Sequence, residues 1–288
     1  MNTLREYIED AQQRKIAIGH FNISDLAGLR GIVEAAKELN LPVIIGLSEG
    51  EREAVGVKNA ACLVKNLREQ YNHPVFLNAD HTHSIEKIKE AVEAGFDAVL
   101  FDAGKLSLEE NIAQTKEVVA WVHKTRPDVL VEAELGYLGS GSTLLEKAPE
   151  GAAITLDAIT KPEDAKRFVQ ETGIDLLAPA VGNIHGMFKN APNPRLFIDR
   201  IAEVRDAAGI PMVLHGGSGI NNDDFTAAIR NGIAIVHINT EIRLAWRQGV
   251  EKALREKPDE VTPYKLLDGA TAAVAAVVRD RMRLFGGV

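Results

Sequence analysis

The chain has 288 residues, of which 45% are hydrophobic and 26% charged, and its formal net charge is −8. This length suits one large α/β barrel better than several small cores. The acidic balance without a basic stripe argues against a nucleic-acid partner, and no apolar run reaches the roughly 18–20 residues of a membrane span. The single cysteine, Cys62, cannot form an internal disulfide and the charged N-terminus lacks a signal-peptide core, so we expect a cytoplasmic protein.

Short apolar runs alternate with amphipathic stretches along the whole chain. The runs are rich in Val, Ile and Leu and do not alternate strictly with polar residues, which is typical of parallel strands buried on both faces. We predict strands at 16–21, 43–47, 75–79, 98–101, 129–135, 176–181, 211–215 and 234–238. We predict helices at 26–39, 60–70, 84–95, 107–124, 162–173, 194–209, 222–232 and 240–254. Several of these helices end at a glycine just before the next strand, as helix C-caps should.

Eight strand–helix pairs in this length predict a single TIM (β/α)8 barrel over residues 1–288. A doubly wound open sheet is the alternative, but no predicted strand is followed by a G-x-G-x-x-G turn. The segment 261–285 adds a C-terminal helix whose Ala/Val-rich face could cover the barrel or a neighbouring subunit. Because chemistry in such barrels sits at the C-terminal ends of the strands, the polar residues there are the candidates for function.

Histidines gather at these strand ends. The residues concerned are His81, His83, His185, His215 and His237. A lone histidine at such a place usually forms a hydrogen bond with a backbone carbonyl and has no further role. Three or more histidines at one rim are poorly explained in this way. Three imidazoles with an open fourth position are a known zinc arrangement, in which the metal acts as a Lewis acid or generates hydroxide.

A candidate anion site lies beside the histidines. The glycines of Gly216-Gly217-Ser218-Gly219 allow close backbone approach, Ser218 adds a hydroxyl donor, and a predicted helix begins directly afterwards. Asn239-Thr240 opens the next helix in the same way. Phosphate sites after the seventh and eighth strands recur in TIM barrels, and Lys189, four residues after His185, could add a positive charge.

Six segments occur in one order: GHFNI near the start, DH at the third strand, VEAELG at the fifth, VGNIHGMF at the sixth, LHGGSG at the seventh and INTEIRLAW at the eighth. Together with YKLL and the closing MRLFG, they resemble the class II, zinc-dependent fructose-bisphosphate/tagatose-bisphosphate aldolases. The resemblance implies reversible cleavage of a ketose 1,6-bisphosphate, with fructose 1,6-bisphosphate favoured, to dihydroxyacetone phosphate and glyceraldehyde 3-phosphate. Tagatose bisphosphate or another ketose phosphate is the alternative within the class. A non-catalytic barrel that supports a partner enzyme is the alternative of another class.

The resemblance also assigns roles to residues. It implies that His81, His185 and His215 hold one zinc ion, with Asp102 and Glu134 at an alternate metal position. Asp80 would take the C4 hydroxyl proton during cleavage. The substrate site implied in this way comprises Asn22, Ser48, Gly186, Gly216, Gly217, Ser218, His237, Ile238, Asn239 and Thr240. Na⁺ or K⁺ near the phosphate and a homodimer or homotetramer are further expectations from the family.

The chain departs from the family pattern at three residues, which are His237, Asn239 and Ser142. His237 stands where the family usually has Asn, followed by Asn239, and could contact the same substrate oxygens or the metal. Ser142 stands where the family's mobile loop carries a proton-transferring Glu, and Glu146 nearby could replace that residue. An H-x-H such as His81-Thr82-His83 also occurs in amidohydrolases, but on the first strand rather than the third. We therefore expect His83 to open the next helix or to line the cleft.

Overall fold

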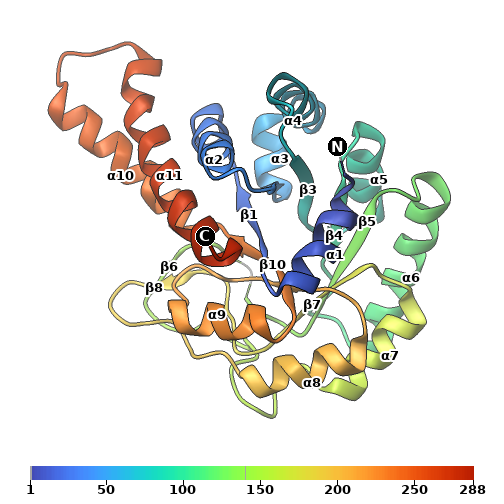
Figure 1. The fold of residues 1–288 in the computed structure, drawn as a ribbon. Coiled ribbons are helices and arrows are strands. Elements are labelled where there is room, and N and C mark those ends of the chain that lie inside the picture. The colour runs from blue at the N-terminus through green and yellow to red at the C-terminus, as the bar shows by residue number, and fades with distance from the viewer. Residues whose placement is uncertain (1, 140) are drawn as a thin grey trace.

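The computed structural model describes residues 2–139 and 141–288. Eight parallel strands close into a barrel in the order β1-β10-β9-β7-β5-β4-β3-β2 (Figure 1), which confirms the predicted TIM barrel. The strands are β1 (Ile18–Asn22), β2 (Val43–Leu47), β3 (Val75–Thr82), β4 (Ala98–Phe101), β5 (Leu130–Leu135), β7 (Leu176–Pro179), β9 (Met212–Leu214) and β10 (Ile233–Ile238).

The strands are buried on both faces, which explains why their sequences show no alternation. Inside the barrel, Ile44, Phe76 and Leu130 belong to one apolar cluster. Helix α1 (Leu4–Arg14) contributes Leu4 and Ile8 to the same cluster and so packs against the barrel interior, near the N-terminal ends of the strands. This helix was not predicted from the sequence, although its apolar residues repeat at helical spacing and Thr3 caps it.

The other helices surround the barrel, and their faces toward the strands form the larger apolar core. They are α2 (Leu26–Leu39), α3 (Glu49–Val55), α4 (Val57–Tyr71), α5 (Ile85–Ala94), α6 (Leu108–Thr125), α7 (Pro162–Thr172), α8 (Ile198–Ala208), α9 (Asn222–Arg230) and α10 (Thr240–Glu256). One helix was predicted after the second strand at 60–70, but α3 and α4 both lie there. Gly56 separates them because its φ of 88° cannot continue a right-handed helix.

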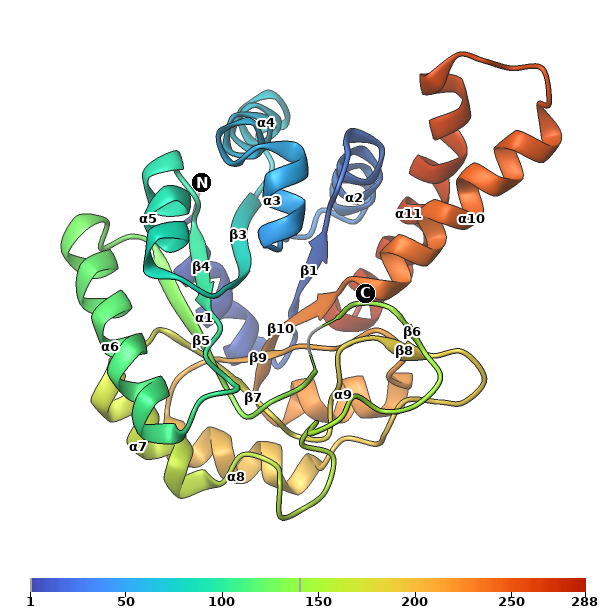
Figure 2. The same ribbon diagram turned by 180° about the vertical axis from the view of Figure 1, so that it is seen from behind.

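The last helix, α11 (Pro263–Gly286), pairs with α10 in a long hairpin that extends away from the barrel (Figure 2). The two helices approach closely at Gly249, where a Cβ atom would lie 2.4 Å from the carbonyl oxygen of Gly269. Further along, α11 packs against α2 and β1 and buries Val274 and Val278. The predicted C-terminal helix therefore covers one side of the barrel, while the outer part of the hairpin projects from it.

Two long loops contact each other near the C-terminal ends of the strands. The loop after β5 carries β6 (Leu144–Leu145), and the loop after β7 carries β8 (Met187–Phe188), and these two short strands pair in parallel. This pairing ties the loop after β5, which contains Ser142 and Glu146 and is called the lid below, to the loop that contains the predicted metal ligand His185. Within the described residues, no helix is both long and apolar enough to cross a bilayer.

Candidate active site

Four side chains converge at the C-terminal ends of the barrel strands: His81, Glu134, His185 and His215. One nitrogen or oxygen from each lies within 4.8 Å of those from the other three. His81 is near the end of β3 and Glu134 is on β5, whereas His185 and His215 follow β7 and β9. The closed barrel brings these strand ends to one rim, so the three predicted zinc-binding histidines lie together with one predicted alternate ligand.

The converging atoms are free to bind a cation. His185 Nε2, His215 Nδ1 and Glu134 Oε2 are buried and have no hydrogen-bond partner among the described residues. Leaving a buried polar atom unpaired costs about 1–3 kcal/mol, so three such atoms facing one another indicate a site that is completed by a metal ion. The donor set of three imidazoles and a carboxylate fits zinc.

The remaining ring nitrogens are held by carboxylates. His215 Nε2 lies 2.7 Å from Glu132 Oε1, and both side chains are fully buried. His81 Nδ1 lies 2.8 Å from Asp102 Oδ2. A carboxylate behind a metal-binding imidazole fixes its tautomer and orientation. Asp102, which was predicted with Glu134 at an alternate metal position, thus contacts His81, whereas the role of Glu132 was not predicted.

The electrostatics of the site favour a cation. Burial alone would lower the pKa of His81, but Asp80, Asp102 and Glu134 outweigh it and raise this pKa to about 10. Burial, followed by the charges of neighbouring histidines, lowers the pKa of His185 well below 6.5. His185 is therefore neutral at physiological pH, which is the state that ligates a metal.

A local irregularity of β3 aims Asp80 and His81 at the same site. Neighbouring side chains in a regular strand point to opposite faces, but the pairing of β3 with β4 shifts register between Ala79 and Thr82. His81 has a φ of 38°, which is uncommon for any residue other than glycine. Such bulges re-aim side chains next to active sites, and this one places the predicted base beside the predicted ligand.

Asp80 is held in its ionised form. Asn22 Nδ2 donates to Asp80 Oδ2 over 2.9 Å, and Asp80 Oδ1 lies 3.4 Å from His237 Nδ1. Burial raises the pKa of Asp80, but the charge of His81 and the contact with His237 overcome this and bring the pKa well below 3.8. Asp80 is therefore placed and charged as a base, and Asn22 orients it.

Two buried histidines stack behind Asp80. The rings of His20 and His237 are parallel within 3° with centroids 3.4 Å apart. Gly46 on β2 leaves the space that the His20 ring fills. His20, His237 and Asp80 form a second group of potential ligands, but the lone pairs of stacked rings lie in two parallel planes, which is poor geometry for binding one ion. His20 lies in the predicted strand 16–21, and its contact with His237 follows from the pairing of β1 with β10.

The glycine-rich turn after β9 forms a hollow next to the metal-binding residues. A Cβ atom at Gly216 would lie 2.2 Å from the carbonyl oxygen of Ile184, and Gly216 has a φ of 60°, so only glycine fits. The hollow is also lined by Asn22, Gly186, Gly217, Ser218, His237, Asn239 and Thr240. Helix α10 begins here, which gives an N-terminus suited to an anion. Ile238, one of the predicted substrate-site residues, lies in β10 and its side chain is buried.

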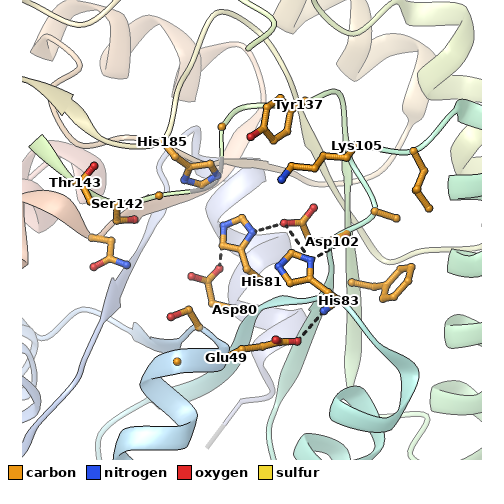
Figure 3. A pocket seen from close by; sticks show the side chains of 18 of the residues that line it. Glu49, Asp80, His81, His83, Asp102, Lys105, Tyr137, Ser142, Thr143 and His185 are labelled. Carbon is orange, nitrogen blue, oxygen red and sulfur yellow. Dashed lines mark hydrogen bonds and ion pairs between the residues drawn. The ribbon is translucent and has the colours of Figure 1, made fainter. Parts of the chain in front are cut away.

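A larger cavity of about 680 Å³ opens outward from Asp80, His81 and His185 (Figure 3). Ser48 and His83 line it as predicted. Several other lining residues were not predicted from the sequence, among them Glu49, Lys105, Tyr137 and Arg243. Lys105 comes soon after β4, so the rule that function follows strand ends could have found it.

Of Ser142, Glu146 and Lys189, which were predicted near the substrate in the loops after β5 and β7, only Ser142 lines the site. Ser142 lines both the cavity and the hollow. Lys189 Nζ lies 2.6 Å from Glu146 Oε1, and this exposed pair joins the lid to the loop after β7. Neither Lys189 nor Glu146 lines the cavity or the hollow.

The fold and site together define a barrel in which three histidines and a carboxylate that could hold a metal ion lie next to a glycine-rich hollow. The chain matches the family described as Fructose-bisphosphate aldolase class-II over residues 2–288. It is 37% identical to the fructose-bisphosphate aldolase of Geobacillus stearothermophilus, over 99% of this chain and 96% of that one. It is also 37% identical to a probable fructose-bisphosphate aldolase of Bacillus subtilis, over 99% and 97% of the two chains.

The fold is likewise similar to the crystal structure of the YdjI aldolase from Escherichia coli, with a TM-score of 0.82 and 32% identity over 98% of this chain and 96% of that one. The chain therefore belongs to the class II fructose-bisphosphate aldolase family, whose members are aldehyde-lyases that are generally zinc-dependent and act on phosphorylated ketoses.

Proposed function

We propose that this chain is a zinc-dependent aldolase that reversibly cleaves fructose 1,6-bisphosphate to dihydroxyacetone phosphate and glyceraldehyde 3-phosphate. One observation carries the proposal: unpaired atoms of His185, His215 and Glu134 converge beside the ionised Asp80. The names of the relatives from Geobacillus stearothermophilus and Bacillus subtilis support this substrate.

The zinc ion would be held by His81, His185 and His215, with Asp102 and Glu134 available to an alternate position. When bound, zinc supplies Lewis-acid stabilisation of the negative charge that develops on the substrate's carbonyl oxygen as the carbon–carbon bond breaks. Glu132 and Asp102 keep His215 and His81 in orientation for this role.

Asp80 moves the protons in this proposal. It accepts the C4 hydroxyl proton during cleavage, and Asn22 fixes the carboxylate for that step. Neither Glu146 nor any other described carboxylate of the lid lines the cavity. Asp80 or a water molecule therefore also delivers the proton to the carbon that leaves as part of dihydroxyacetone phosphate.

The ketose phosphate would bind in the hollow after β9 and β10. Backbone amides of Gly186 and 216–218, the hydroxyl of Ser218 and the segment 237–240 would hold it, with Na⁺ or K⁺ as a further partner of the phosphate. The space for close approach that the glycines provide supports this assignment. A contact from Lys189 stays a prediction that requires its pair with Glu146 to open.

Tagatose 1,6-bisphosphate is the second candidate substrate. It differs from fructose 1,6-bisphosphate in the configuration at C4, the carbon whose hydroxyl Asp80 would deprotonate. His237, at a position where the family usually has Asn, contacts Asp80 and would therefore lie beside the C4 hydroxyl. The observation favours testing both epimers.

The test is triose-phosphate release from each bisphosphate by the zinc-loaded protein. Asp80→Ala should nearly abolish turnover and leave zinc bound, while His215→Ala should lose zinc. Unchanged turnover in Asp80→Ala would remove Asp80 from the mechanism, and full zinc occupancy in His215→Ala would show that the ligand set is wrong. A zinc-loaded protein that cleaves neither substrate would favour the non-catalytic alternative.

We further propose that residues 1–288 act as one aldolase domain in the cytoplasm, assembled as a homodimer or homotetramer. The projecting hairpin of α10 and α11 supports assembly because it exposes Leu254, Val261 and Tyr264. Light scattering of the purified protein measures the oligomeric state directly.

A further inference from the structure

The barrel order sets the direction in which an extended substrate must lie. The anion hollow follows β9 and β10, which are neighbours in the barrel. Counting around the eight strands, β3 and β4 lie opposite that pair. A ketose phosphate with its phosphate in the hollow and its carbonyl at the three histidines therefore extends toward the loops after β3 and β4.

Two cationic side chains of Lys or Arg type line the larger cavity within the described part of the chain: Lys105 and Arg243. Arg243 is already engaged, because its Nη2 lies 2.6 Å from Glu51 Oε1 and its Nη1 donates to the Ser142 carbonyl over 3.0 Å. It lies on α10, next to the hollow rather than across from it.

Lys105 lies on the opposite side of the cavity, in the loop after β4. Its Nζ is 5.0 Å from the centroid of the Tyr137 ring, and no ion pair joins it to a described carboxylate. Figure 3 shows the side chain reaching from this loop toward the space in front of His81 and His185. The cavity thus contains one cation without a carboxylate partner among the described residues, on the side where the aldehyde half would lie.

We propose that Lys105 binds the anionic terminal group of the aldehyde half of the substrate and so selects aldehydes that end in a phosphate or a carboxylate. This assignment rests on the proposed aldolase function and concerns the specificity of the same site. The ring of Tyr137 keeps the ammonium group within the cavity by a cation–π contact. Arg243 could serve the same group only by giving up its contacts with Glu51 and Ser142.

The experiment measures aldol condensation of dihydroxyacetone phosphate with three acceptors: glyceraldehyde 3-phosphate, succinic semialdehyde and uncharged glyceraldehyde. Lys105→Met keeps most of the side-chain volume and removes the charge. It should raise KM for a charged acceptor by about tenfold or more, the loss expected for one charge-assisted hydrogen bond. The kcat for that acceptor should change little, and kcat/KM for glyceraldehyde should change much less.

Lys89→Ala is the matched control, because Lys89 also lies over an aromatic ring, that of Trp121, but does not line the cavity. It should leave all three acceptors unaffected. Selective loss in Lys105→Met with the phosphate alone, the carboxylate alone or both supports the proposal and identifies the group that is bound.

Equal losses for charged and uncharged acceptors in Lys105→Met would overturn the assignment while leaving the aldolase function intact. A selective loss in Arg243→Met that is absent in Lys105→Met would also overturn it and place the anion at Arg243. If the zinc-loaded wild type condensed none of the acceptors, the proposed function would fail and the assignment with it.

Discussion

Replacing Gly46 by alanine should displace Asp80 indirectly, through His20 and His237. Gly46 lies on β2 and His237 on β10, on the two sides of β1, so the His20 ring is enclosed between them. A Cβ atom at Gly46 would lie 2.0 Å from His20 Cε1 and 2.5 Å from its Nε2. Carbon atoms in contact are normally about 3.5–4.0 Å apart, so the ring would have to move by roughly 1.5 Å.

The His20 ring is fully buried, so a shift would press on its neighbours. It stacks on His237 at 3.4 Å, and His237 in turn contacts Asp80. Overpacking of this kind destabilises a protein by about 1–3 kcal/mol. A displacement of about 1 Å passed on to a catalytic group lowers the rate by up to about 10²-fold. We therefore expect Gly46→Ala to lower both the free energy of unfolding and kcat.

The assay combines chemical denaturation with triose-phosphate release for Gly46→Ala, His20→Ala and the double variant. Because His20→Ala removes the clashing ring, the two changes should couple by about 1–3 kcal/mol, and the double variant should be more stable than additivity predicts. Strictly additive effects, or a Gly46→Ala variant with unchanged stability and kcat, would refute the enclosed stack as the means by which His237 is placed.

Three other changes probe different contacts. Glu132→Gln should weaken zinc affinity about 10–100-fold by loosening His215, which competition with a chelator would measure; unchanged affinity would exclude that role. Zinc should also raise the melting temperature in a concentration-dependent way, because it binds the folded chain, and an identical temperature with and without zinc would contradict the site. Burial lowers the pKa of His73 below 6.5 despite its contact with the Leu41 carbonyl. His73 is therefore protonated at a higher pH in the unfolded chain than in the folded one, and the free energy of unfolding should fall as the pH drops below about 6.5. In pH-dependent denaturation, His73→Gln should lose less stability over this range than the wild type. Equal losses in the two proteins would exclude His73 as a cause.

The sequence predicted the features that depend on local pattern. Strands buried on both faces have continuous apolar runs. The rule that function follows strand ends selected five histidines, and the family resemblance singled out His81, His185 and His215 among them. The helix boundaries failed where the cause was a backbone angle, as at Gly56 between α3 and α4.

What the sequence could not predict depends on register and backbone geometry. The bulge that aims Asp80 and His81 at one site requires a left-handed residue that no sequence signal announces. The stack of His20 on His237 depends on the pairing of β1 with β10, whose members are more than 200 positions apart. Spacing from His185 suggested that Lys189 faces the phosphate, whereas the pairing of β6 with β8 brings its side chain to Glu146.

The proposed aldol cleavage depends on a zinc ion held by three histidines. A zinc titration of the chelator-stripped protein tests this requirement, with triose-phosphate release from fructose 1,6-bisphosphate as the signal. We expect no activity without metal and a linear rise that ends at one zinc ion per chain. Full activity in the stripped protein, or activity that does not respond to zinc, would contradict the proposed mechanism.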